Sequence, residues 1–350
     1  MQPTDLSARV ATQRPVIGRH QPPALVDGFG RRITYLRLSI SDRCDFRCIY
    51  CVPSKKRFAD RKERLSLDEL ARVAAAFVDL GAHKIRLTGG EPLLRPGALE
   101  LIRQIAALPR LTELVLTTNG SQLERLASPL RKAGVRRINI SLDSLQPERF
   151  RALTRTGDLA KVLRGIDNAI AAGFERIKLN SVILKGRNHD EILDLARFAM
   201  AKGINLSFIE EMPFGTIGDY DRAETFYPAD RIREQLAAEF ALVPTTESTG
   251  GPARYYRIPG SETRVGFIAP RSHNFCSACN RVRVTADGRL LPCLGDSQSV
   301  DLRAVLRAYP SRTETLKTAI AEAMGIKPER CEFSPDSKPI EFRHLMETGG

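Results

Sequence analysis

The chain has 350 residues, of which 42% are hydrophobic and 27% charged, as in a globular protein that buries a sizeable core. Its formal net charge of +13 favours anionic partners such as nucleic acid, nucleotides or anionic lipid. Because Trp is absent and other aromatic residues are few, platforms for stacking bases are scarce. We therefore expect a phosphorylated small molecule as the partner, and no nucleic acid.

Residues 1–24 are predicted to form a disordered leader, because Pro3, Pro15, Pro22 and Pro23 would interrupt a helix. The leader contains Arg and few acids, as organelle transit peptides do, but it lacks the apolar core of a secretory signal. No apolar run in the chain approaches the ~20 residues that span a bilayer. We therefore expect a cytoplasmic protein with no membrane partner. In that reducing compartment, clustered cysteines usually bind metal or carry out chemistry.

From residue 33 onward, predicted strands and helices alternate at the spacing of βα units. Ser66 and Glu69 have the spacing of a capping box, Pro96 is expected near the first turn of a helix, and Pro129 is expected to bend or interrupt another. Six units predict a parallel α/β sheet curled into a partial barrel over residues 25–213. The predicted strands are 33–40, 84–88, 113–118, 137–142, 176–184 and 205–211, and the predicted helices are 66–82, 96–108, 121–134, 159–173 and 189–203.

The alternation ends after residue 213, which predicts a smaller carboxyl-terminal region over residues 214–350. Residues 245–256 have the composition of a loop that leads into short strands. Residues 281–293 are typical of a hairpin that turns at Asp287-Gly288, and residues 311–325 of a helix.

Chemically distinctive residues follow the predicted strands, where parallel α/β folds place their sites. They are Cys44, Gly89-Gly90, Asn119-Gly120, Asp143 and Met212-Pro213. We expect a site at this end of the sheet.

Three of the seven cysteines, Cys44, Cys48 and Cys51, have the spacing C-x3-C-x2-C. Thiolates bind zinc, copper or iron–sulfur clusters, and structural zinc normally takes four protein ligands. The nearest histidines are His20 and His83. A [4Fe–4S] cluster on three cysteines would leave one iron open to a small molecule. A zinc knuckle with a remote fourth ligand is the alternative.

This cysteine motif, with Tyr50 before its last member, precedes Gly89-Gly90-Glu91-Pro92 after the second predicted strand. The combination resembles the radical S-adenosylmethionine (SAM) superfamily. The resemblance implies that SAM chelates the open iron, and that one electron then splits it into methionine and a 5′-deoxyadenosyl radical. It also implies that the glycines allow the backbone to approach the amino group of SAM.

A second cysteine set, Cys276, Cys279 and Cys293, has the spacing C-x2-C-x13-C. On spacing alone His273 could complete a zinc site here, and Cys331, 38 residues further on, is expected to be an ordinary free thiol. With Arg281 and Arg283 between the cysteines and Gly349-Gly350 at the end, the chain from about residue 25 resembles the molybdenum cofactor biosynthesis protein A family, the GTP 3′,8-cyclases. That resemblance implies a second [4Fe–4S] cluster facing the guanine of GTP.

The resemblance also implies the remaining site residues. SAM contacts are expected at Tyr50, Gly90, Ser141 and Met212, and GTP contacts at Arg37, Arg86, Thr117, Lys178, Arg281 and Arg283. Arg281 and Arg283 are also expected to be catalytic, as a proton source or a stabiliser of charge. Their guanidinium groups suit a triphosphate, although their alternation with Val282 also suits an exposed strand. The chain departs from the usual family motif at Asp45, where Asn is expected, and at Val52, where Met is commoner.

The family resemblance implies a reaction in which hydrogen leaves the 3′ carbon of the GTP ribose and that carbon bonds to carbon 8 of guanine. It further implies a flavodoxin- or ferredoxin-type reductant, product transfer to cyclic pyranopterin monophosphate synthase, a Gly-Gly tail that reaches into the barrel, and a monomer or homodimer. The alternatives are another radical SAM enzyme with an auxiliary cluster, such as a peptide maturase, or a metal-stabilised RNA-binding protein.

Overall fold

A computed structural model describes residues 24–51, 61–213, 220–331 and 345–348. Their strands form one sheet, in the order β12-β11-β10-β1-β2-β3-β4-β5-β6-β9-β8-β7. The bounds are β1 Tyr35–Ser39, β2 Lys84–Thr88, β3 Glu113–Thr118, β4 Arg137–Ser141, β5 Arg176–Ile183, β6 Asn205–Glu210, β7 Val243–Pro244, β8 Arg254–Arg257, β9 Arg264–Ile268, β10 Arg281–Val284, β11 Arg289–Leu291 and β12 Val300–Asp301.

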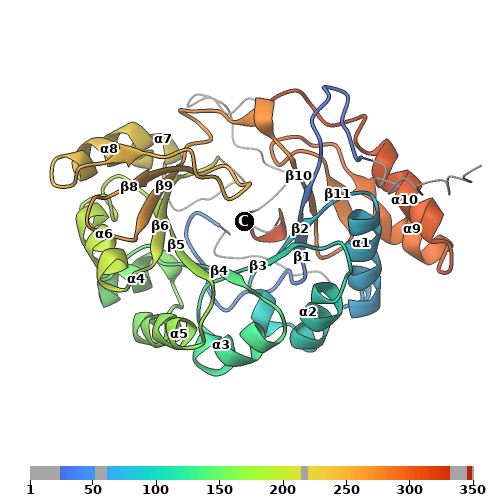
Figure 1. Ribbon diagram of the computed structural model, residues 1–350, viewed down its shortest axis with the longest axis horizontal. Coiled ribbons are helices and arrows are strands. Elements are labelled where there is room, and N and C mark those ends of the chain that lie inside the picture. The colour runs from blue at the N-terminus through green and yellow to red at the C-terminus, as the bar shows by residue number, and fades with distance from the viewer. Residues whose placement is uncertain (1–23, 52–60, 214–219, 332–344, 349–350) are drawn as a thin grey trace, which may run out of the picture.

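Most of the helices cover the outer face of this curved sheet, whereas α11 lies on its concave side (Figure 1). The α-helices are α1 Leu67–Asp79, α2 Ala98–Ala106, α3 Leu123–Lys132, α4 Pro147–Thr154, α5 Leu159–Ala171, α6 Ile192–Ala201, α7 Arg222–Thr225, α8 Ala229–Ala237, α9 Leu302–Ala308, α10 Thr313–Glu322 and α11 Leu345–Thr348. Short 3₁₀ helices are η1 Arg61–Glu63, η2 Pro92–Leu94 and η3 Cys276–Ala278.

Strands β1 to β6 are consecutive and parallel, as the βα alternation predicts. Two later strands extend this parallel sheet, because β10 pairs with β1 at one edge and β9 pairs with β6 at the other. The chain beyond residue 213 therefore builds both flanks of the sheet. The proposed division at residue 213 remains a prediction, since strands on both sides of it share one sheet.

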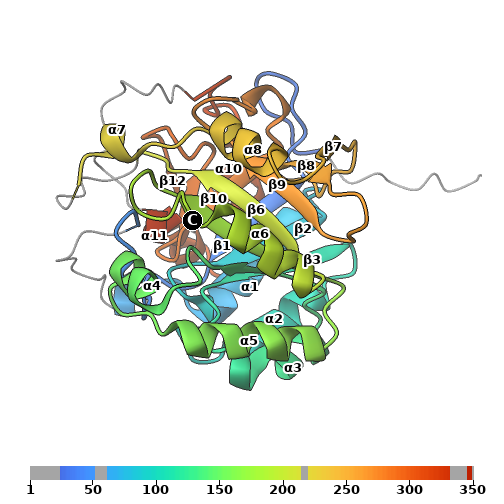
Figure 2. The same ribbon diagram turned by 90° about the vertical axis from the view of Figure 1, so that its left-hand side faces the viewer.

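Apolar residues on the helices and on the outward faces of the strands form one main core. In α1, Leu70, Val73 and Phe77 recur at helical spacing and are fully buried against the sheet. Burial of each such side chain contributes roughly 1.5–3 kcal/mol. This packing leaves the concave side of the sheet free to carry polar side chains, and Figure 2 shows the helical layer from the side.

The eleven strands and helices predicted up to residue 211 are confirmed, with ends that shift by a few residues. The capping box is present, because Ser66 Oγ accepts from the Glu69 N–H at 3.0 Å and Glu69 Oε2 accepts from the Ser66 N–H at 2.7 Å. Pro96 lies near the first turn of α2, as predicted, directly before the N-cap Gly97, which has φ of +79°. Helix α3 continues through Pro129.

The predicted hairpin is confirmed as β10 and β11, which pair antiparallel, with Gly288 at a φ of +89° in the turn. The predicted helix 311–325 is α10. Helices α4, α7, α8, α9 and α11 were not predicted from the sequence. Within the described ranges, no helix combines the length and apolar character that crossing a membrane requires.

Candidate active site

All sixteen residues predicted for the site line a single cavity of about 320 Å³ on the concave side of the sheet. Both cysteine sets lie along its wall, as do the residues expected to contact SAM and GTP. Such a volume is in the range of small-molecule sites. The residues are Cys44, Cys48, Cys51, Cys276, Cys279, Cys293, Tyr50, Gly90, Ser141, Met212, Arg37, Arg86, Thr117, Lys178, Arg281 and Arg283.

The loop carrying Cys44 packs directly against the glycines that follow β2. The Gly90 N–H donates to Ser41 O at 2.7 Å, and the Glu91 N–H donates to Arg43 O at 2.7 Å. A Cβ on Gly90 would lie 2.4 Å from Arg43 O and 3.1 Å from Cys44 Cβ, closer than side chains tolerate. The glycines are therefore needed for the close approach of two backbone loops, one of which carries the first cysteine of the motif.

Glu91 fixes the same loop to the end of β3. Its side chain is fully buried and accepts from Leu93 N at 3.0 Å, Thr118 Oγ1 at 2.9 Å and Asn119 N at 2.7 Å. Burial raises the pKa of Glu91 to about 7, although these hydrogen bonds oppose the shift. The Asn119 amide then reaches Cys44 Sγ at 3.7 Å.

Tyr50 links the cysteine loop to the end of β4. Its hydroxyl donates to Asp143 Oδ2 at 2.6 Å, while Asp143 Oδ1 accepts from the Val182 N–H at 2.8 Å. Burial raises the pKa of Asp143 to about 6. Loops after β1, β2, β3 and β4 are thus joined around the first cysteine set.

Strand register aligns the basic side chains in two rows across β10, β1 and β2. Arg37 is paired with Arg283 on one side and with Arg86 on the other. One pleat earlier, Tyr35 is paired with Arg281 and with Lys84. Because alternate residues of a strand point to one face, all of these side chains are directed to the concave side.

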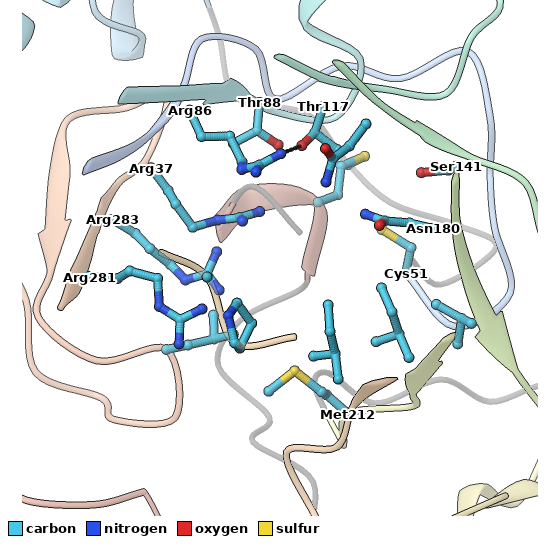
Figure 3. A pocket seen from close by; sticks show the side chains of 18 of the residues that line it. Arg37, Cys51, Arg86, Thr88, Thr117, Ser141, Asn180, Met212, Arg281 and Arg283 are labelled. Atoms are coloured by element: carbon cyan, nitrogen blue, oxygen red, sulfur yellow. Dashed lines mark hydrogen bonds between the residues drawn. The ribbon is translucent and has the colours of Figure 1, made fainter. Parts of the chain in front are cut away.

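Figure 3 shows Arg37, Arg86, Arg281 and Arg283 converging on the cavity, with Met212 facing them from below. Arg86 Nη1 also donates to Thr117 Oγ1 at 2.9 Å. Lys178, on β5, donates to Tyr255 Oη at 3.2 Å. The cations therefore come from separate strands and face one volume.

This concentration of buried positive charge is unfavourable without an anion. Burial lowers the pKa of Arg37 to about 10, and burial followed by repulsion from Arg37 and Arg281 lowers the pKa of Arg283 well below its usual range. Burial also lowers the pKa of Lys178. Binding of a polyanion would relieve both the desolvation and the repulsion. The site is therefore suited to a ligand such as a nucleoside triphosphate.

The second cysteine set lies at the same cavity, with Cys276 and Cys279 in and after η3 and Cys293 after β11. His273 does not complete this set, because it is exposed, pairs through Nε2 with Asp230 Oδ2 at 2.8 Å and is absent from the cavity wall. Instead Cys331 lies beside the set, and its N–H donates to Cys276 Sγ at 3.4 Å. The position of Cys331 beside the second cysteine set was not predicted from the sequence.

Helix α11 brings the end of the described chain to the cavity. Met346 lines the wall, and Arg283 Nη1 donates to Thr348 O at 3.3 Å. The predicted Gly349-Gly350 tail lies outside the described residues, as do Val52 and the leader up to residue 23.

Comparison with known proteins agrees with this geometry. A profile of the radical SAM superfamily matches residues 38–199, and one of the molybdenum cofactor synthesis C family matches residues 204–333. The GTP 3′,8-cyclase of Pseudomonas entomophila is 58% identical over 330 residues, which cover 94% of this chain and 99% of that relative. The GTP 3′,8-cyclase of Pseudomonas syringae pv. syringae is 56% identical over 331 residues, with the same coverage.

This chain belongs to the GTP 3′,8-cyclase family.

Among solved structures, Streptococcus suis SuiB bound to S-adenosylmethionine has a TM-score of 0.59 and 15% identity, covering 91% of this chain and 78% of that one. At that identity the likeness supports the α/β radical SAM fold alone. For a member of the GTP 3′,8-cyclase family, the peptide-maturase and RNA-binding alternatives have no comparable support.

Several residues at the site of this cyclase-family member were not predicted from the sequence, among them Tyr35, Lys327 and Cys331. Tyr35 is two residues before Arg37, so the two-residue period of a strand could have placed it on the same face. Lys327 and Cys331 reach the second cysteine set only through the return of the chain after α10, and no local pattern indicates that return.

Proposed function

We propose that this chain is a radical SAM GTP 3′,8-cyclase that converts GTP to (8S)-3′,8-cyclo-7,8-dihydroguanosine 5′-triphosphate in molybdenum cofactor biosynthesis. The observation that carries this proposal is the single cavity in which two three-cysteine sets flank two rows of basic side chains. The family relationship supports the same conclusion.

The cysteine sets suit [4Fe–4S] clusters better than single metal ions. Each set supplies three thiolates, whereas structural zinc normally takes four protein ligands. A cubane cluster takes one thiolate per iron, so three cysteines leave its fourth iron open to a small molecule. In the proposed assignment, one cluster is held by Cys44, Cys48 and Cys51 and the other by Cys276, Cys279 and Cys293.

When bound, the first cluster and SAM supply the one-electron chemistry that removes hydrogen from the substrate, and the second cluster supplies a metal site for guanine. The chain itself positions these groups. The Tyr50–Asp143 hydrogen bond and the Gly90 contact with the cysteine loop fix that loop, and Gly90, Tyr50, Ser141 and Met212 are assigned to SAM.

GTP is assigned to the basic rows. Arg37, Arg86 and Lys178, with Thr117, would bind the triphosphate and ribose, because guanidinium groups bind phosphate oxygens in pairs. Arg281 and Arg283 are the members of these rows on β10, the strand that begins two residues after Cys279. They are assigned to stabilise negative charge on the guanine, or to deliver the proton it takes up when carbon 3′ bonds to carbon 8.

Interactions beyond the site complete the proposal. A flavodoxin- or ferredoxin-type protein would supply electrons, and cyclic pyranopterin monophosphate synthase would receive the product. The protein is proposed to be a cytoplasmic monomer or homodimer.

The test uses full-length protein purified and reconstituted without oxygen, incubated with dithionite, SAM and GTP. Mass spectrometry would follow 5′-deoxyadenosine and the cyclised nucleotide, and iron would be counted in the same sample. Two clusters predict about eight irons per chain, with both products present.

A triple variant in which Cys276, Cys279 and Cys293 are replaced by Ala provides the matched control. It should retain about four irons and SAM cleavage but lose the cyclised product. If the wild-type protein cleaves SAM without altering GTP, GTP is not its substrate. If the protein binds zinc and does not cleave SAM, it is not a radical SAM enzyme.

A further inference from the structure

The short segment Lys327–Cys331, after α10, donates hydrogen bonds to two members of the second cysteine set and brings the Cys331 side chain next to the third. Lys327 Nζ donates to Cys279 Sγ at 3.6 Å, and the Cys331 N–H donates to Cys276 Sγ at 3.4 Å. Cys331 and Cys293 both line the cavity wall, and their side chains are close enough to interact. A metal-bound Cys293 is a thiolate without a proton, so in this pair only the Cys331 thiol could donate a hydrogen bond.

Lys327 is held in place by all of its protons. It is 2% exposed, and besides Cys279 its ammonium donates to Pro292 O at 2.6 Å and Arg281 O at 3.1 Å. An ammonium group has three protons, and each has an acceptor here. Lys327 therefore presents a fixed donor and a positive charge to the sulfur of Cys279.

Arg31 clamps the same segment to the cysteine loop. Its Nη1 donates to Cys276 O at 2.9 Å and to Glu329 O at 2.5 Å, and its Nη2 donates to Pro328 O at 2.6 Å. The guanidinium is itself fixed through Nε by Asp27 Oδ2 at 2.6 Å. The two donors to sulfur are thus part of a rigid, largely buried arrangement.

We propose that the segment Lys327–Cys331 raises the reduction potential of the second cluster by hydrogen-bonding its cysteine ligands. The inference rests on the proposed function, which assigns a cluster to these cysteines. Reduction adds negative charge to the sulfur atoms, and hydrogen-bond donors stabilise the reduced state more than the oxidised state. The positive charge of Lys327 acts in the same direction.

Cys331 is assigned as a donor and not as a fourth ligand. The chain thus leaves the fourth iron available to substrate. A donor and a ligand at position 331 can be told apart by experiment, because only loss of a ligand changes the thiolate coordination of the iron.

The test uses the full chain with Cys44, Cys48 and Cys51 replaced by Ala, so that only the second cluster is loaded. Its midpoint potential would be measured by a redox titration followed by electron paramagnetic resonance. Lys327→Met and Cys331→Ala are each expected to lower the reduced-to-oxidised ratio at a fixed potential roughly tenfold, equivalent to about 59 mV for one electron. Cys331→Ser keeps a hydroxyl donor and should lie near the parent value, as should the exposed control Lys185→Met.

Unchanged potentials in both Lys327→Met and Cys331→Ala, with about four irons bound, would overturn the proposal. Loss of a thiolate ligand in Cys331→Ala, read from the Mössbauer spectrum, would also overturn it by making Cys331 a ligand. If Lys327→Met does not fold, the comparison of Cys331→Ala with Cys331→Ser decides alone. A parent protein that binds no iron would refute the proposed function itself, which separates the two failures.

Discussion

The hydroxyl of Tyr35, on β1, accepts a hydrogen bond from Nε of Arg86, on β2, inside the basic wall of the cavity. The ring is 2% exposed, and Lys84 Nζ lies 5.0 Å from its centroid. Burial alone would raise the pKa of Tyr35, but the charges of Arg86, Arg37 and Lys84 outweigh burial and lower that pKa to about 7. A tyrosinate here would be an internal counter-ion for the arginines.

We predict that one tyrosine ionises near pH 7 in the folded protein without GTP, and that Tyr35→Phe removes this transition. The ultraviolet difference spectrum of tyrosinate measures it, with the exposed Tyr309→Phe as control. Because triphosphate would neutralise the neighbouring cations, added GTP should move the transition to higher pH. A first tyrosine transition near 10, unaffected by Tyr35→Phe, would contradict the prediction.

The same shift makes stability depend on pH. The folded pKa of Tyr35 lies below its ordinary value of 10.0, so ionisation stabilises the fold. This contribution is complete above pH 10 and disappears as the pH falls through about 7. The difference in free energy of unfolding between wild type and Tyr35→Phe should therefore grow from pH 7 to pH 10. A constant difference across that range would show that Tyr35 remains neutral.

Arg283→Ala is predicted to weaken GTP binding without lowering the stability of the protein. Arg283 is buried between like charges, so its removal relieves repulsion while it deletes a charged contact to phosphate. We expect GTP affinity to fall about 10- to 100-fold, since a hydrogen bond to a charged group contributes about 1.5–3 kcal/mol. Calorimetric titration measures the affinity, and the melting temperature without GTP should change little.

Arg289→Ala, in the neighbouring strand β11, is the matched control, because that side chain is 48% exposed and outside the cavity wall. It should preserve GTP affinity. A large drop in melting temperature for Arg283→Ala would assign Arg283 to the fold instead of the ligand.

Gly90→Ala is predicted to displace the loop that carries Cys44. The new Cβ would lie 2.4 Å from Arg43 O, so the backbone must move, at a cost of about 1–3 kcal/mol. We expect a lower urea midpoint and loss of about four irons from the first cysteine set. Gly28→Ala is the control, since a Cβ there meets open space. Full iron content in Gly90→Ala would show that the loop tolerates the methyl group.

The features that depend on residues close together in the chain were predicted correctly from the sequence. The Ser66–Glu69 capping box follows from spacing alone, and the period of apolar residues gives the alternating strands and helices. The cysteine and glycine motifs indicated the site because they follow neighbouring strands, whose carboxyl ends share one edge of a parallel sheet.

Pairings between strands that are far apart in the chain could not be predicted from the sequence. The position of β10 beside β1, which puts Arg283 level with Arg37, joins residues about 250 apart, and no period or spacing encodes it. Lys327 and Cys331 reach the second cysteine set in the same way. Helix α4 was missed because it is one short element, Pro147–Thr154, inserted where the alternation predicts a loop.

The last prediction concerns Asp45, a position at which the family resemblance implies Asn. Its Oδ1 accepts from Asn119 Nδ2 at 2.6 Å, and the same amide nitrogen reaches Cys44 Sγ at 3.7 Å. An Asn at position 45 keeps an acceptor oxygen for this contact but removes a negative charge beside the first cysteine set. Negative charge opposes reduction, so Asp45→Asn should raise the potential of the first cluster, by up to about 100 mV for a nearby charge at an effective dielectric constant of about 20.

The measurement is a redox titration of protein that lacks the cysteines of the second set, so that only the first cluster is loaded. Asp68→Asn, an exposed carboxylate on α1, controls for net charge and should leave the potential unchanged. Asp45→Ala removes both the charge and the acceptor, so it should raise the potential and also loosen the Asn119 contact. Equal potentials for wild type and Asp45→Asn would mean that solvent or Asn119 already screens this carboxylate from the cluster.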